Sequence, residues 1–160
     1  MIVEKQKFKN KVIWLIVLLL NCIALFGIIK QLIYKIPFGE NPAPNFILVL
    51  GFITTLLLLA MLFLIYLKVT INENEIIVHF YPFTKKVIQL SEIKNIEIVE
   101  YRPLKDYGGW GIRYGKKGMA YTIGGKQGLS ITLINNTNIL IGISNKNNYK
   151  SLKTRNYENN

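Results

Sequence analysis

The sequence predicts a membrane-anchored all-β protein, in which a two-helix transmembrane hairpin precedes an antiparallel β domain with a short C-terminal helix. Two observations lead to this fold class. The stretch 46–67 (FILVLGFITTLLLLAMLFLIYL) contains no charged residue, and at about 1.5 Å per residue it is long enough to cross a hydrocarbon core of about 30 Å. Directly after it, from Lys68, apolar and polar residues alternate with the period of a β-strand. Because no Gly/Ser linker intervenes, we expect the β domain to be held against one membrane face.

Composition supports this class. The 160 residues are 51% hydrophobic, yet the chain has a net charge of +11, a combination that fits a membrane protein with basic surroundings better than a soluble enzyme. The single cysteine, Cys22, lies in an apolar run, so the sequence contains no intramolecular disulfide and no zinc-ligand pattern.

A first membrane span is predicted at residues 12–29, where Asn21 is the only polar interruption. The preceding residues 1–11 alternate lysines and are predicted to be a cytoplasmic basic tail. A secretory signal peptide is the competing interpretation. The apolar run is long for a signal peptide, and no small-x-small cleavage site follows it, so we expect an uncleaved span.

Lysine bias predicts the orientation. Four lysines precede the first span, whereas the loop 30–45 carries two, and Lys68 and a basic domain follow the second span at 46–67. The positive-inside rule then places both termini and the β domain in the cytoplasm, and the loop outside. This predicts a multi-pass membrane protein; the cytoplasmic (inner) membrane of a bacterium is the location that the family resemblance given below implies.

Asn21 needs a hydrogen-bond partner, because an unpaired amide is costly in lipid. In an antiparallel hairpin it lies at about the depth of Thr54 and Thr55, so we predict an interhelical contact with one of them. A substrate or ion path is the alternative interpretation, and the lack of any charge in the two spans argues against it.

The β domain is predicted to occupy residues 68–152, and residues 153–160 are predicted to be a disordered tail. A helical turn is expected at 91–94, capped by Ser91, and one or two helical turns within 145–157. The hairpin turn 115–118 has glycine at both ends, as a tight turn with positive φ requires. Strands are expected at residues 69–71, 75–81, 85–90, 96–101, 110–113, 119–123, 129–134 and 139–143.

A family resemblance rests on three segments. The stretch 70–78 (TINENEIIV), Pro82-Phe83 and the stretch 87–96 (VIQLSEIKNI) resemble the start of bacterial pleckstrin-homology-like (PH-like) domains, which occur as membrane-anchored modules behind a transmembrane hairpin. The YGGWGIR sequence at 107–113 also resembles a motif of uncharacterised small bacterial membrane proteins. The resemblance implies a strongly bent antiparallel sheet or small barrel, closed at one end by a C-terminal helix. The turn 72–75 is acidic where phosphoinositide-binding relatives are basic, so that ligand is not expected.

Catalytic patterns are weak. His79 is the only histidine and lies in a predicted strand, with no Asp or Cys near it to suggest a triad or a metal site. No serine lies in a Gly-x-Ser-x-Gly elbow, and neither a dinucleotide fingerprint nor a phosphate loop is present. We therefore expect no enzymatic activity, no cofactor and no metal.

Basic residues interleaved with aromatics in and around the glycine-rich segment 107–128 are the candidate site. Cations and aromatic rings together are typical of a face that contacts lipid headgroups or a partner. The interpretation that we favour from sequence alone is core aromatics with solvating charges. Nucleic-acid binding is a third option that membrane tethering disfavours. The candidate contacts are Arg102, Lys105, Trp110, Arg113, Lys116, Lys117 and Lys126.

Three functional hypotheses follow. The first is a membrane-anchored PH-like interaction module at the cytoplasmic membrane face, which binds membrane lipids or a membrane or cytoplasmic protein, not nucleic acid; a homo-oligomer is compatible with it. The second is an accessory or assembly subunit of a larger membrane complex, joined through the hairpin. The third, a hydrolase or transferase, lacks the residues it needs.

Overall fold

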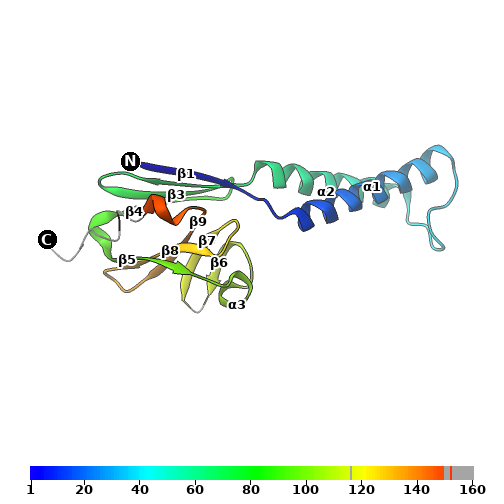
Figure 1. Ribbon diagram of the computed structural model, residues 1–160. Coiled ribbons are helices and arrows are strands. Elements are labelled where there is room, and N and C mark those ends of the chain that lie inside the picture. Colours follow the sequence, from blue (N-terminus) through cyan, green and yellow to red (C-terminus); the bar gives the residue numbers. More distant parts are fainter. Residues whose placement is uncertain (116, 150–151, 153–160) are drawn as a thin grey trace. The chain divides into compact units, whose positions relative to one another are not determined.

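The computed structural model describes residues 1–115, 117–149 and 152 and divides the chain into two compact units (Figure 1). One unit is helical and comprises Lys9–Leu64. The other is a β unit that combines Met1–Phe8 with the chain from Ile65 onward. Each unit is described here by itself.

Two long helices form the helical unit. Helix α1 (Lys11–Ile28) begins after Asn10, whose side chain accepts hydrogen bonds from the backbone of Val12 and Ile13, and it continues into a π-helical stretch, η1 (Ile29–Ile33). Helix α2 spans Asn45–Leu64. Most of their apolar side chains are exposed, and both helices are long and apolar enough to cross a membrane.

The helix ends differ from the predicted spans. The second span was expected to reach residue 67, but α2 ends at Leu64 and strand β2 begins at Tyr66. Leu67 is fully buried in the β core, which explains why it leaves the helix despite its apolar character. The first helical stretch was expected to end at residue 29 and instead runs on to Ile33.

The first sheet contains four antiparallel strands in the order β1-β2-β3-β4. The N-terminal residues were expected to be a basic tail, and this is corrected by the structure: they form β1 and pair with β2, from Ile2 opposite Ile71 to Lys7 opposite Tyr66. The helical unit is therefore inserted between two neighbouring strands. The strands are β1 (Ile2–Lys7), β2 (Tyr66–Ile71), β3 (Glu75–Tyr81) and β4 (Thr84–Gln89).

The second sheet has five strands in the order β5-β8-β9-β7-β6. An antiparallel sheet was expected, but this sheet is mixed. Strand β9 runs beside β7 in the same direction, with Met119 opposite Ile139. The elements are η2 (Leu90–Glu92), β5 (Ile93–Glu100), α3 (Pro103–Tyr107), β6 (Gly111–Gly115), β7 (Gly118–Thr122), β8 (Gln127–Leu133), β9 (Asn138–Ile143) and the 3₁₀ turn η3 (Lys146–Tyr149).

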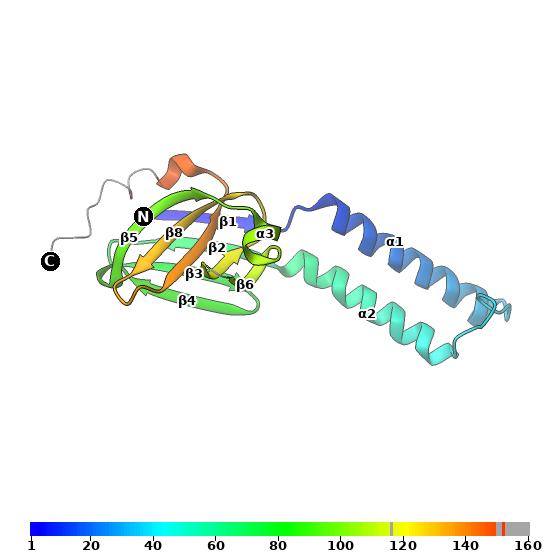
Figure 2. The ribbon, with the colours of Figure 1, turned by 90° about the horizontal axis from the view of Figure 1, so that it is seen from below.

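The core of the β unit lies between the two sheets, which are seen as two layers in Figure 1 and face-on, one in front of the other, in Figure 2. Alternate apolar residues of β2, β3 and β4 face those of β5, β8 and β9, as the period of the strands requires. Tyr149 and Leu152 join this core from the C-terminal side. Within the predicted helical region 145–157, the structure describes a 3₁₀ turn at Lys146–Tyr149 and a helical residue at Leu152. The rest of that prediction, with the disordered tail, falls outside the described residues.

Candidate functional site

Helix α3 forms one end of the candidate basic site. The Asp106 carboxylate accepts a hydrogen bond from the Arg102 backbone N–H at 2.8 Å and so closes the first turn of the helix. Strand β6 packs closely on α3: a Cβ at Gly115 would lie 2.7 Å from both the Asp106 carbonyl oxygen and the Tyr107 ring. The β6–β7 hairpin is therefore positioned against α3 by a glycine.

Three of the predicted cations gather around Asp106. Its pKa lies below the ordinary value, first because the Arg102 backbone donates to it, and then because Lys117, Arg102 and Lys105 are nearby. Lys105 and Lys117 are exposed, whereas Lys116 falls outside the described residues. This basic cluster thus contains its own counter-charge.

Trp110 and Arg113 have structural partners. The Trp110 indole N–H donates to the Gly125 carbonyl oxygen at 3.1 Å, and Arg113 Nε donates to the Trp110 carbonyl oxygen at 3.3 Å. Lys126, next to Gly125, has an exposed side chain and a carbonyl oxygen that accepts from the Tyr101 backbone. The structure therefore brings Trp110, Arg113 and Lys126 to one loop region.

A groove of about 550 Å³ lies on the outer side of the second sheet. Tyr101 and Tyr107 contribute to it with edge-to-face rings whose centroids are 6.3 Å apart, and burial is the main cause that raises the pKa of both hydroxyls. Its polar lining consists of hydroxyl, amide and charged groups of both signs, which are suited to hydrogen bonds with a polar ligand. These lining residues are Glu100, Asp106, Lys117, Ser130, Thr132 and Asn138.

The helical unit contains one buried polar contact. Asn21 is only 8% exposed, and its amide donates to the carbonyl oxygens of Val17 and Thr55. Thr55 donates back to Asn21, whereas Thr54 is exposed and donates to Leu50 of its own helix. The structure therefore brings Asn21 together with Thr55 and leaves Thr54 apart.

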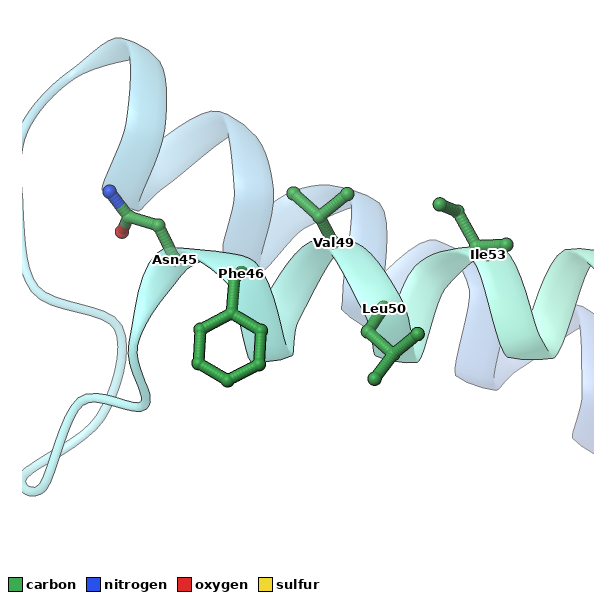
Figure 3. Close-up of a pocket in the computed structure, with 5 residues that line it drawn as sticks. All are labelled: Asn45, Phe46, Val49, Leu50 and Ile53. Atoms are coloured by element: carbon green, nitrogen blue, oxygen red, sulfur yellow. The ribbon is translucent and has the colours of Figure 1, made fainter.

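Helix α2 also has an apolar recess near its start (Figure 3). The recess has a volume of about 470 Å³ and is formed by one helix alone. Phe46 and Leu50 are 69% and 58% exposed there. Among the described residues of the whole chain, no group of three or more His, Cys, Asp or Glu side chains could hold a metal ion.

A buried polar cluster ties β1 to the second sheet, and the sequence analysis missed it. Glu4 Oε1 accepts from the Ser144 backbone at 2.7 Å, from the Ser144 hydroxyl at 2.6 Å and from the Gln6 amide at 2.6 Å. Gln6 also donates to the Gly142 carbonyl oxygen. Tyr149 is fully buried beside this cluster, and its pKa is raised first by burial and then by the negative charge of Glu4. The alternation within residues 2–7 was the only sequence signal for this docking.

Comparison with known proteins adds no relative: no family model, no curated protein and no solved structure matches the chain. The structure itself defines the class, which is a pair of apolar helices joined to a β unit of two packed sheets.

Proposed function

We propose that the protein is a membrane-anchored interaction module of the bacterial PH-like type. Its two helices cross the cytoplasmic membrane as a hairpin, and its β unit works at the cytoplasmic face. There it contacts anionic lipid or a protein partner and catalyses no reaction. The observation that carries this proposal is the pairing of β1 with β2 on either side of the helical unit.

Strand pairing restricts the topology. Residues before α1 hydrogen-bond to residues after α2, from Ile2 with Ile71 to Lys7 with Tyr66. Segments that share a sheet lie on the same side of a bilayer, so an apolar pair of helices between them crosses and returns. The lysines at positions 5, 7, 9 and 11 favour the cytoplasmic side for both ends.

The same pairing argues against removal of the first helix as a signal peptide. Cleavage after α1 would also remove β1, which would expose the edge of β2 and leave Ser144 without its carboxylate partner Glu4. Unpaired strand edges promote association with other chains. Retention of α1 is therefore part of the proposal.

An accessory or assembly subunit is the second candidate. The exposed apolar surface of α2, with the recess between Phe46 and Ile53, favours this role, because helices in membranes also associate through such surfaces. In that case the hairpin binds another membrane protein and the β unit has a supporting role.

Thiol labelling in intact cells tests the topology. In a Cys22→Ser background, a cysteine at Asn41 should react with a membrane-impermeant reagent, whereas one at Asn145 should react only after the cells are opened. Asn41 and Asn145 are both exposed, so neither outcome reflects burial within the protein. Labelling of Asn145→Cys in intact cells would overturn the orientation.

Photo-crosslinking in membranes separates the two candidates. A crosslinker at Val49 or Ile53 reports on the hairpin surface, and one at Lys105 reports on the basic cluster of the β unit. The module hypothesis expects lipid or protein adducts at Lys105, with lipid alone at the helix positions. A single protein captured from Val49 and Ile53, with none at Lys105, would favour the accessory subunit.

A further inference from the structure

The outer face of the first sheet carries two rows of side chains that only the strand register reveals. In β1, Lys5 and Lys7 lie on the face opposite the buried Glu4 and Gln6. One row crosses three strands and the other crosses four. The rows are Lys7–Tyr66–Tyr81 and Lys5–Lys68–His79–Lys85. We call these two rows the basic–aromatic face.

Aromatic contacts order this face. The rings of Tyr66 and Tyr81 stack with centroids 5.0 Å apart and an interplanar angle of 8°. The His79 ring meets each of them edge-on at 5.8 Å. Lys5 Nζ lies 4.1 Å from the Tyr66 ring centroid, a cation–π distance. The three rings therefore form a continuous aromatic surface, and the Lys5 ammonium group covers its edge at Tyr66.

Two lysines of the second row repel each other. Lys5 lies directly opposite Lys68, and like charges opposite each other destabilise a sheet. Lys85 lies opposite His79 at the other end of the row. Neither row contains a carboxylate, and among the described residues none of the row's lysines forms an ion pair. The basic cluster at α3 differs, because Asp106 neutralises part of it. An external anion would relieve the repulsion on the basic–aromatic face.

The chain connection keeps Tyr66 of the first row close to the end of α2. Ile65 alone separates Leu64 of α2 from Tyr66, so these two residues are at most about 7 Å apart. The β3–β4 turn lies at the same end of the sheet, because Tyr81 pairs with Tyr66, and Phe83 in this turn is 52% exposed. The second row follows about 7 Å further along the strands.

This order of groups corresponds to the layers of a membrane surface. Tyrosine rings are enriched at the interface, and lysines in the adjacent aqueous layer are attracted to anionic headgroups. By chain length alone, Tyr66 and Lys68, one from each row, lie within roughly one to two Debye lengths, of about 8 Å each, of the point where α2 ends. An exposed Phe83 at the turn fits the boundary with the acyl chains.

We propose that the basic–aromatic face binds the anionic phospholipid headgroups of the leaflet in which the helices end, with Phe83 at the acyl boundary. This inference rests on the proposed membrane anchoring and names the lipid-binding surface, which differs from the basic cluster at α3. Binding fixes the first sheet at the membrane surface and leaves the groove of the second sheet to a partner.

Spin-label depth measurements on the full chain test this proposal. In a Cys22→Ser background, a nitroxide at Phe83→Cys is compared with one at Asn74→Cys, an exposed turn residue between β2 and β3 at the other end of the first sheet. The protein is placed in nanodiscs with or without phosphatidylglycerol. The Phe83 label should lose exposure to a water-soluble relaxation reagent only with anionic lipid, and salt should restore it. The Asn74 label should remain exposed throughout.

Charge variants identify the surface responsible. Each lysine near an anionic leaflet contributes about a fivefold preference, so K5Q/K68Q/K85Q, which removes three charges, should weaken the protected state about a hundredfold. The charge reversal K5E/K68E/K85E should weaken it more, and the milder glutamine variant keeps the proposal testable if the reversal misfolds. The matched K94E/K105E/K117E should retain protection at Phe83.

Two outcomes overturn the inference. A Phe83 label that stays in water in anionic nanodiscs shows that the face is free for a protein instead. Loss of protection only in K94E/K105E/K117E assigns lipid binding to the cations of β5 and the α3 cluster. Failure of the proposed membrane anchoring is distinguished beforehand, because the protein would then not incorporate into nanodiscs or would be extracted from membranes by alkaline carbonate.

Discussion

Asn21 of α1 and Thr55 of α2 exchange two hydrogen bonds. The Asn21 amide donates to the Thr55 carbonyl oxygen at 3.1 Å, and the Thr55 hydroxyl donates to Asn21 Oδ1 at 3.3 Å. Thr54, the preceding residue, instead bonds Leu50 within its own helix. In the lipid setting proposed for the hairpin, no water replaces a lost partner, so this pair would specify which faces of the two helices meet.

Removing the pair should therefore weaken the hairpin. We expect Asn21→Leu and Thr55→Val each to lower the free energy of helix separation by about 0.6–1.7 kcal/mol. Thr54→Val is the matched control and should have a smaller effect, because its hydroxyl is exposed and bonded within α2. Energy transfer between dyes at the outer ends of the helices, followed during denaturation in bicelles, measures the separation. Equal losses for Thr54→Val and Thr55→Val would contradict the assigned helix faces.

The sequence could predict the depth of Asn21 but not its partner. Successive helix residues point about 100° apart, so Thr54 and Thr55 face different directions. Both helices are apolar on nearly every side, and such a pattern does not fix their rotation about the axis. The choice between the two threonines required the packed helices.

In the β unit, local alternation predicted most strands, whereas partners distant in sequence were not predictable. The buried and exposed residues of β3 alternate as the pattern 75–81 indicated. Strand β1 was missed because its lysines suggested a solvated tail, although the other face carries Glu4. The parallel pairing of β7 with β9, and the alignment of Lys5 with Lys68, depend on sheet order and register, which local periodicity does not contain.

Glu4 should be a main determinant of β1 docking. Glu4→Ala removes the acceptor for two Ser144 donors and for Gln6 in a buried setting, and we expect a loss of about 3 kcal/mol in the free energy of unfolding of the β unit. Glu97→Ala is a matched control, since Glu97 accepts from Asn95 at the exposed surface, and should change stability by less than about 0.5 kcal/mol. Urea unfolding followed by limited proteolysis measures both. A Glu4→Ala variant as stable as Glu97→Ala would show that β1 docks without this carboxylate.

Alkaline pH should destabilise the β unit. Burial is the main cause that raises the pKa of Tyr101, Tyr107, Tyr121 and Tyr149, so the folded state holds their protons more tightly than the unfolded state does. A tyrosine whose pKa is higher in the folded state contributes stability that is fully present below its pKa in the unfolded state, about 10. This contribution is lost as the pH rises through its pKa in the folded state. Unfolding free energy should therefore be level between about pH 7 and 9 and fall above about pH 10.

Tyr149 should account for the largest part of this loss. Tyr149→Phe keeps the ring in the core and removes the ionisable hydroxyl beside Glu4, so its stability should decline less steeply above about pH 10. Tyr114, which is 83% exposed, provides the control, and Tyr114→Phe should follow the parent profile. Chemical denaturation at a series of pH values gives the comparison. Parallel profiles for the parent and Tyr149→Phe would exclude Tyr149 as the source.

Gly118 should be required for the parallel pairing of β7 with β9. Its φ of +101° disfavours any side chain, and a Cβ there would collide with the Asn138 carbonyl oxygen at the start of β9. Gly118→Ala must push the two strands apart just before the Met119–Ile139 pair, and we expect a loss of at least about 2 kcal/mol in unfolding free energy.

Gly124 provides the matched control for this substitution, since a Cβ at Gly124 has no atom within 4 Å. Gly124→Ala should change stability by less than about 0.5 kcal/mol. Amide hydrogen exchange locates the effect: exchange at residues 119–121 should accelerate in Gly118→Ala and stay at the parent rate in Gly124→Ala, because only the first substitution separates β7 from β9. Unchanged exchange at 119–121 in a destabilised Gly118→Ala would mean that the strain is released in the 115–118 turn and that the parallel pairing tolerates it.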